Sequence, residues 1–443
     1  MVTIAEMPQY ASYIDSGFPL IGQIPEFWKI NRLKVCLKRK ITDGPHETPI
    51  FLEEGVPFLS VDGIQDGNLL FEGCRFVSKE AHEKYSKKCM VEKNDILMGK
   101  AASTGKIARV KVDFPFSIWS PLALIKINPN IASPKFVEYA LKSESSQIQI
   151  DHLCTSNTQK NISMDDIPKI RLCLPPIVEQ MAIAEFLEKK ITQLDQAIAI
   201  KLNQISLLKE RQKILIQHAI TRGLNQDVLM RNSGVEWIGD IPTHWEVRRS
   251  KFLFTQRKER AWKNDIQLSA TQAYGVIPQD EYERLTGSTV VKIQFHLDKR
   301  KHVEKDDFVI SMRSFQGGLE RAWSRGCIRS SYVVLKPMES IDADFFGYLL
   351  KLPRYIEALQ KTGNFIRDGQ DLNFDNFSQV DLFIPPIREQ RAIAARVKNI
   401  VETTEAVNSL QTKQIEKLKE YKMSLINSAV TGKIKITPEM VEG

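Results

Sequence analysis

The feature that most constrains this chain is that two of its phrases occur twice, in the same order. DSGFPLIGQIPEFWKINRLK begins at Asp15, and the related phrase NSGVEWIGDIPTHWEVRRSK begins at Asn232. LPPIVEQMAIAEFLEKKI begins at Leu174, and IPPIREQRAIAARVKNIV begins at Ile384. A repeat of this length predicts that the unit of construction is half of the chain.

Between these phrases the two halves differ, except in one segment. VEKNDILMGKAASTGKI from Val91 corresponds to VEKDDFVISMRSFQGGL from Val303. Apolar runs such as VPFLSV, DILMG, SPLALIKI and SYVVLKP predict buried strands, and FVEYALKS and FFGYLLKL predict short helices. We therefore expect two α+β modules in tandem. The pattern favours two modules that perform the same task on different targets, although a duplication kept for stability alone would also produce it.

The proline-proline phrase predicts the start of a long helix in each half. Pro176 suits a first helical turn, which needs no N–H there, and Glu179 favours the positive end of the helix dipole. Gly223 is expected to end the first helix, and the second stops near Gly432. At about 35–40 residues each, the helices would be about 50–60 Å long. We expect them to pair antiparallel as a coiled coil that holds the modules at a fixed separation.

Apolar residues spaced by three and four define the expected seam of this coiled coil. The same set serves as the predicted surface for docking partners. These residues are Leu187, Ile191, Leu194, Ile198, Ile205, Leu208 and Leu215 in the first helix, and Val401, Ile415, Leu418 and Leu425 in the second.

The repeat predicts a division of the chain into recognition modules and helices. The predicted segments are a first module over residues 1–174, a first helix over 175–223, a second module over 224–384, a second helix over 385–432 and a C-terminal tail over 433–443.

The sequence favours a cytoplasmic protein without a membrane segment. Its six cysteines are scattered and form no C-x-x-C pair, which fits a reducing compartment better than a disulfide framework or a zinc site. The start MVTIAEMPQY does not resemble a signal peptide, and no run has the roughly 18 apolar residues that span a bilayer. The net charge of +8 favours a polyanionic partner, although many basic proteins bind no nucleic acid.

Two segments resemble catalytic motifs but lack their essential residues. GKAASTGKI has five residues between its glycines, and Ile107 stands where a phosphate loop needs a hydroxyl for magnesium. Methyltransferases that act on amino groups of DNA bases place Asn or Asp before Pro-Pro and an aromatic residue after it. Here Leu174 and Ile384 precede the prolines, while Ile177 and Ile387 follow them. We therefore expect no catalytic residue, no metal site and no bound cofactor in this chain.

Basic and polar residues at corresponding positions of the two halves are the candidates for binding DNA. Arg and Lys can bond guanine edges and Gln can bond adenine, and basic runs after the opening phrases could face phosphates. A tight turn between strands, or a solvated face, would explain the same residues without DNA. The candidates are Lys100, Ser103, Thr104 and Lys106 in the first half, and Arg257, Lys258, Arg260, Arg313, Ser314 and Gln316 in the second.

Taken in order, the paired S-G-x-x-x-I-G-x-I-P-x-x-W and P-P-I-x-E-Q phrases resemble the specificity subunit of type I restriction–modification systems. TSNTQKNISMDDIPKI, ATQAYGVIP and ISMRSFQGGLERAW also resemble segments of that family. The resemblance implies two target recognition domains that each read one half of a bipartite double-stranded DNA sequence, with the helices as spacer. It also implies that two methyltransferase subunits and translocating restriction subunits dock on the chain. S-adenosylmethionine, ATP and magnesium would then be bound by those partners.

Two other interpretations remain open from the sequence. One is a fused recognition piece with enzymatic activity of its own, against which the absent cofactor motif counts. The other is a coiled-coil DNA-binding scaffold or regulator that acts without modification partners.

Overall fold

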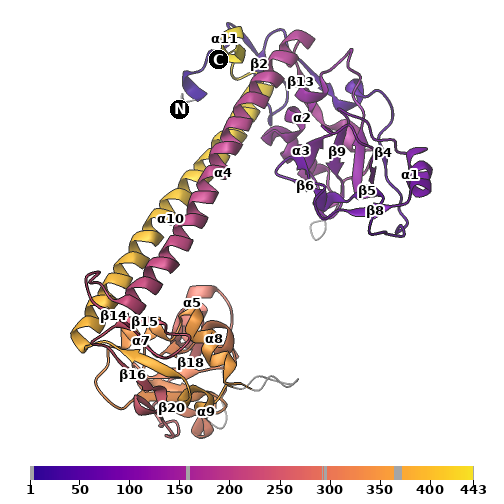
Figure 1. The fold of residues 1–443 in the computed structure, drawn as a ribbon. Helices are drawn as coiled ribbons and strands as arrows, with labels where there is room; N and C mark the ends of the chain where they lie inside the picture. Colours follow the sequence, from indigo (N-terminus) through magenta and orange to yellow (C-terminus); the bar gives the residue numbers. More distant parts are fainter. Residues whose placement is uncertain (1–3, 156–159, 292, 294–296, 364–371, 443) are drawn as a thin grey trace. The chain divides into compact units, whose positions relative to one another are not determined.

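The structure of the chain is a computed structural model (Figure 1). It describes residues 4–155, 160–291, 293, 297–363 and 372–442.

The chain divides into two compact units. Unit 1 consists of Met1–Leu202 and Gln411–Gly443, and unit 2 consists of Asn203–Leu410. Both division points fall inside long helices, α4 (Ile177–Arg222) and α10 (Ile387–Val430). Each unit therefore contains a mixed module, the start of one long helix and the end of the other.

Unit 1 is built around a four-stranded sheet in the order β10-β9-β12-β4, in which neighbouring strands are antiparallel. Figure 1 shows α2 and α3 beside this sheet. Its strands are β4 (Thr42–Asp43), β9 (Ile96–Gly99), β10 (Ile107–Arg109) and β12 (Leu122–Ile125). The other strands are β1 (Tyr13–Asp15), β2 (Gln23–Pro25), β3 (Lys29–Arg32), β5 (Val56–Leu59), β6 (Ile64–Gln65), β7 (Asn68–Leu69), β8 (Arg75–Val77), β11 (Ser117–Ile118) and β13 (Arg171–Leu174). The helices are α1 (Lys79–Ser86), α2 (Pro134–Lys142), α3 (Glu144–Leu153) and α11 (Pro438–Glu442), with 3-10 turns η1 (Ile4–Glu6), η2 (Leu33–Cys36), η3 (Val61–Gly63) and η4 (Ile167–Lys169).

The sheet of unit 1 is buried on both faces, which explains why its strands read as continuous apolar runs. In β9, Ile96 and Met98 pack in one cluster with Phe136 of α2. Leu97 points to the opposite face and packs with Leu59 of β5. Because successive side chains of a strand alternate between faces, a strand covered on both sides has no polar position.

Unit 2 repeats this sheet order as β17-β24-β21-β22. Its strands are β14 (Met230–Asn232), β15 (Asp240–Pro242), β16 (Glu246–Arg249), β17 (Phe254–Gln256), β18 (Leu268–Thr271), β19 (Gly275–Pro278), β20 (Lys301–Val303), β21 (Phe308–Ile310), β22 (Glu320–Arg321), β23 (Gly326–Ile328), β24 (Val333–Pro337) and β25 (Asp381–Ile384). The helices are α5 (Gln279–Thr286), α6 (Ser314–Gly317), α7 (Ala343–Leu349), α8 (Pro353–Lys361) and α9 (Phe374–Ser378), with 3-10 turns η5 (Ser250–Phe252) and η6 (Leu297–Lys299). Phe308 and Val309 of β21 again enter clusters on opposite faces.

The long helices run antiparallel within each unit. In unit 1, Lys201 of α4 donates to Gln411 of α10 at 3.0 Å, and Asp195 accepts from Lys422 at 2.6 Å. Residue numbers thus rise along one helix as they fall along the other. The expected architecture of two mixed α+β modules with two long antiparallel helices is confirmed.

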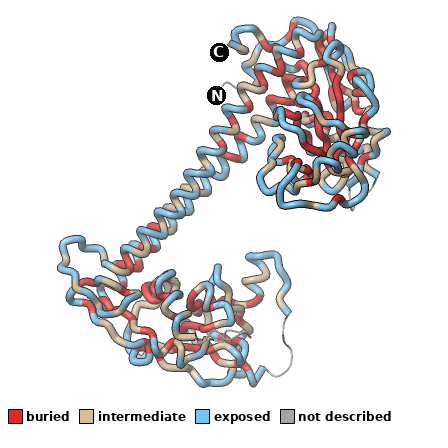
Figure 2. Tube along the Cα trace, turned by 45° about the vertical axis from the view of Figure 1, so that its right-hand side comes forward, coloured by how far each residue is buried: buried red, intermediate tan, exposed pale blue. Residues whose placement is uncertain are grey.

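The seam contains most of the predicted apolar residues, although it is only partly buried. Most residues of α4 between Lys201 and Leu215 are exposed, and Figure 2 shows long exposed stretches along the two helices. Leu215 itself is 38% exposed, which corrects the expectation that it is buried in the seam; it lines a pocket together with Ala219 and Ile400. Buried seam residues are Leu187, Ile191, Leu194, Ile198, Ile415, Leu418 and Leu425, and half-buried ones are Ile205, Leu208 and Val401.

The glutamine of each P-P-I-x-E-Q phrase ties the start of a long helix to its module. The side chain of Gln180 donates to the carbonyl of Pro175 at 2.9 Å and accepts from the N–H of Ser133 at 2.9 Å. Ser133 is the N-cap of α2. Gln390 repeats both bonds at 2.8 Å, the second from the N–H of Asp342, the N-cap of α7. The repeated phrase therefore fixes how each module joins its helix.

Each long helix ends on a glycine that packs against an opening phrase. Gly223 and Gly432 have φ of +75° and +72°, as a left-handed helix cap requires. A Cβ on Gly432 would lie 2.4 Å from Pro25, and one on Gly223 would lie 3.2 Å from Trp245. Helix α4 ends at Arg222, directly before Gly223, and α10 ends at Val430, two residues before Gly432.

All six cysteines lie in described parts of the chain, and each is a free thiol. Within the described residues, no group of three or more His, Cys, Asp or Glu side chains could hold a metal ion. In the same residues, no helix is long and apolar enough to cross a membrane.

Candidate nucleic-acid interface

The shared V-E-K-[N/D]-D segment forms the same turn in both units. Asn94 and Asp306 adopt φ of +70° and +71°, a conformation that Asn and Asp tolerate better than most residues. The next residues, Asp95 and Asp307, accept hydrogen bonds from the N–H of the glutamate three positions earlier, at 2.7 and 2.8 Å. Because this turn leads into β9 and β21, the loops that follow these strands occupy equivalent positions.

A cation holds each buried aspartate of this turn. Lys126 lies 2.5 Å from Asp95, and Arg257 lies 2.6 Å from Asp307. Burial raises the pKa of Asp307 above its usual value, and the hydrogen bond from Arg257 offsets this only in part. Arg257 also contacts Glu259 at 2.8 Å, and its side chain is 13% exposed. The largely buried Arg257 therefore stabilises the turn and is not a surface residue.

In unit 1 the loop between β9 and β10 exposes one of its four predicted residues. Lys106 is exposed, whereas Ser103 and Thr104 are half-buried. Thr104 donates to the carbonyl of Lys160 at 2.6 Å. The side chain of Lys100 is 15% exposed and lies 3.1 Å from Asp43. The loop joins two antiparallel strands, whereas a phosphate loop leads into a helix N-terminus.

In unit 2 the equivalent loop exposes Arg313 and Gln316. Ser314 is 1% exposed and accepts a hydrogen bond from the N–H of Ser311 at 2.9 Å, so it shapes the loop from inside. The carbonyl of Arg313 accepts from the side chain of Gln272 at 3.2 Å. Gln272 lies in the turn of the β18–β19 hairpin, and this turn is therefore fixed beside the loop.

Two exposed aromatic residues lie at the β18–β19 hairpin turn that contacts this loop, and sequence reasoning missed both; a Cβ on Gly275 in this hairpin would lie 2.8 Å from Trp323. Tyr274, in the turn with Gln272, is 40% exposed, and Trp323, just after β22, is 47% exposed. The guanidinium of Arg321 lies 4.3 Å from the centre of the Trp323 ring. Rings next to exposed Arg and Gln side chains can contact base edges and thymine methyl groups. Tyr274 lies in the segment ATQAYGVIP and Trp323 in the segment LERAW. Nothing in either sequence segment indicates that its aromatic side chain is exposed.

Basic side chains also follow β17 of unit 2. Lys258 and Arg260 are exposed, as expected for residues that contact phosphates. In unit 1 the equivalent strand β4 leads into a group that sequence reasoning missed, in which His46, Lys88 and Lys100 surround Asp43.

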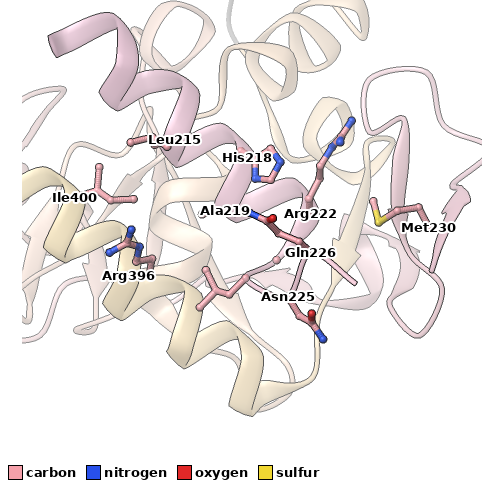
Figure 3. Close-up of a pocket in the computed structure, with 11 residues that line it drawn as sticks. Leu215, His218, Ala219, Arg222, Asn225, Gln226, Met230, Arg396 and Ile400 are labelled. Atoms are coloured by element: carbon pink, nitrogen blue, oxygen red, sulfur yellow. The ribbon is translucent and has the colours of Figure 1, made fainter. Parts of the chain in front are cut away.

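A pocket of about 500 Å³ lies elsewhere in unit 2, where α4 ends and α10 begins (Figure 3). Arg222 and Arg396 contribute charge to its lining, and Leu215 and Ile400 contribute apolar surface. None of the predicted DNA-binding residues lines it. The candidate base-reading residues thus lie on exposed loops and not in this hollow.

Comparison with known proteins agrees with this arrangement of two equivalent modules. The Type I restriction modification DNA specificity domain matches residues 47–206 and 242–417. The type I restriction enzyme MjaVIII specificity subunit of Methanocaldococcus jannaschii is 22% identical over 437 residues, which cover 94% of each chain.

Two solved structures share the fold. One comes from a study of complex assembly and conformational transition of the type I R-M system, with a TM-score of 0.68, 15% identity and coverage of 92% of this chain and 98% of that one. The HsdS subunit from Thermoanaerobacter tengcongensis gives a TM-score of 0.52 at 14% identity, over 93% and 98% of the two chains. Because the two matched regions together span more than half of the sequence, this chain belongs to the family of type I restriction modification DNA specificity proteins.

Proposed function

We propose that this chain is the DNA specificity subunit of a type I restriction–modification complex, and that each unit reads one half of a bipartite double-stranded target. The observation that supports this proposal most directly is that the two modules are equivalent. They share a sheet order and a supporting turn, but their equivalent loops present different side chains, Lys106 in unit 1 and Arg313 with Gln316 in unit 2. Two readers of one design with different contacts suit a target whose halves differ.

The chain itself supplies recognition and not catalysis. Two methyltransferase subunits dock on it for adenine methylation, and translocating restriction subunits complete the complex. These partners bind S-adenosylmethionine, ATP and magnesium, and the complex acts in the cytoplasm. The long helices support partner docking, because α4 exposes apolar side chains that its own seam does not use, Val178 and Met181 in unit 1 at 76% and 60%.

A module exchange tests this function. Residues 40–165 are replaced by the corresponding residues of another family member, and the chain is expressed with its methyltransferase subunits. Methylome sequencing is expected to show a new sequence in one half of the target and the original sequence in the other. A change in both halves, or in neither, would contradict the assignment of one reader to each unit.

The regulator interpretation predicts a different outcome. A scaffold that acts alone would bind a specific sequence without partners and would direct no methylation when they are present. Methylation at a bipartite sequence, absent when this chain is omitted, would exclude that interpretation.

A further inference from the structure

One buried carboxylate in unit 1 is surrounded by three basic side chains. The side chain of Asp43 is 3% exposed, and its Oδ1 lies 2.6 Å from Lys88 Nζ. Its Oδ2 lies 3.1 Å from Lys100 Nζ and 3.0 Å from His46 Nε2. Burial would raise the pKa of Asp43, but hydrogen bonds from Lys88 and Lys100 outweigh it and leave the pKa below its usual value. Asp43 is therefore a carboxylate at neutral pH.

The sheet brings these residues to the edge that carries the β9–β10 loop. Asp43 ends β4, and Lys100 follows β9 directly. Because β12 is antiparallel to both strands, the carboxyl ends of β4 and β9 lie at the same edge. Lys88 comes from the other side, two residues beyond the end of α1. The group thus lies beside the loop that exposes Lys106.

The backbone after Asp43 is held so closely that only glycine fits. A Cβ on Gly44 would lie 1.8 Å from the carbonyl oxygen of Ile118 in β11. The N–H of Ser120 also donates to the carbonyl of Pro45 at 3.2 Å. These contacts fix the short segment that carries His46, whose side chain nevertheless remains 70% exposed.

The group holds more positive charge than the buried carboxylate needs. Two ammonium groups and an imidazole share one carboxylate, and the next acid along the chain, Glu47, is paired with Lys84 at 2.8 Å. The side chain of Lys88 is 56% exposed, so its ammonium can also reach an anion in solvent. The exposed ammonium of Lys88 has three donors, of which Asp43 takes one. The arrangement holds cations in place with donors left for another anion.

We propose that Lys88, Lys100 and His46 form a clamp for a backbone phosphate of double-stranded DNA, with Asp43 as the residue that positions them. This inference rests on the proposed function, since it places the DNA at the edge of the sheet where Lys106 is exposed. Phosphate contacts carry no sequence information but fix the register of the loops that read bases. The exposed Lys258 and Arg260 follow the equivalent strand of unit 2, so both units carry cations at this position.

The test is the salt dependence of DNA binding by the full chain with its methyltransferase subunits. Binding is measured from low to high KCl with a duplex that contains the methylated target and with a duplex of unrelated sequence. For Lys88→Gln we expect the slope of log K against log salt to shrink by about 0.9, the value for one lost phosphate contact. Affinity should fall by a similar factor on both duplexes. Lys88→Arg, which keeps the charge, should retain the wild-type slope.

Lys93→Gln is the matched control. Lys93 is 53% exposed, pairs with Asp113 at 2.9 Å and precedes β9, whereas Lys100 follows it. This variant should bind both duplexes with the wild-type slope. Because Lys88→Gln also removes a partner of the buried Asp43, its thermal unfolding is measured as well, and binding is compared at a temperature at which both proteins are folded.

The outcomes separate this inference from the proposed function. A wild-type slope for Lys88→Gln, or a loss confined to the target duplex, would overturn the phosphate clamp and leave the specificity role intact. A wild-type complex that methylates no bipartite sequence would overturn the proposed function itself.

Discussion

The indole N–H of Trp245 donates a hydrogen bond to Glu389 Oε2 at 3.0 Å, and in unit 1 the indole of Trp28 does the same to Glu179 at 3.2 Å. Each tryptophan belongs to an opening phrase and each glutamate to a helix start, so the two repeated phrases meet in each unit. Trp28 and Trp245 are only 2% and 1% exposed. A buried indole N–H requires an acceptor, which explains why the phrases recur together.

Glu389→Ala should therefore destabilise unit 2. The substitution leaves the indole N–H of Trp245 buried without its acceptor, which typically costs about 1–3 kcal/mol. Urea unfolding followed by tryptophan fluorescence would measure the loss. Glu402→Ala is the control, because Glu402 lies on the same helix with its side chain 63% exposed and pairs with Lys398 at the long distance of 3.9 Å. An equal loss in both variants would show that the indole bond contributes nothing.

Because Glu320 is buried, its ionisation should make the protein less stable as the pH rises. A surface carboxylate whose pKa is lowered by a salt bridge has the opposite effect on stability. Burial raises the pKa of Glu320 above its usual value, and Lys351 at 2.7 Å offsets this only in part. The folded state therefore holds the proton more tightly than the unfolded state does. The stability contributed by this group is present below the unfolded pKa of about 4.3 and is lost as the pH rises through the folded pKa.

Glu320→Gln removes this ionisation and should make unit 2 more stable than the wild type at neutral pH. Thermal unfolding across the acidic to neutral range would show a flatter pH dependence for the variant. Glu281→Gln, at a side chain that is 44% exposed, serves as control and should follow the wild-type curve. A Glu320→Gln protein that is less stable than the wild type at neutral pH would contradict this account.

The sequence predicted the parts of the fold that repeat, because repetition reveals what the backbone needs. The helix starts, their glycine ends and the apolar strands all lie where the pattern placed them. The function of Gln180 could not be predicted, because its partner Ser133 is 47 residues away and only the fold brings them together.

The candidate site was harder to predict, since charge alone does not tell whether a side chain is exposed. Arg257 and Lys100 look like Lys106 in sequence, but each faces a buried aspartate. Those aspartates, Asp307 and Asp43, lie 50 and 57 residues away in the chain. No local pattern signals such a pair.

Arg313 and Gln316 should control one half of the DNA target. Both are exposed on a loop fixed by Gln272, and a lost base contact costs about 1–3 kcal/mol of discrimination. Arg313→Ala is expected to relax the methylated sequence in the half read by unit 2 and to leave the other half unchanged. Methylome sequencing measures both halves at once. The control is Arg284→Ala, since Arg284 lies on α5 with its side chain 77% exposed; relaxed specificity there would argue against a special role for the loop.

Lengthening both long helices by one heptad should lengthen the spacer of the target. Seven residues are inserted after Lys201 in α4 and seven before Gln411 in α10, the residues that pair at 3.0 Å, so that the seam keeps its register. The insertion adds about 10 Å at 1.5 Å per residue, which corresponds to about three base pairs at 3.4 Å each. Methylome sequencing should find the same two half-sites with a longer gap. Seven residues inserted after Gln226, in an exposed segment outside both helices, should leave the gap unchanged. An unchanged gap with the helix insertion would mean that the helices do not set the spacing.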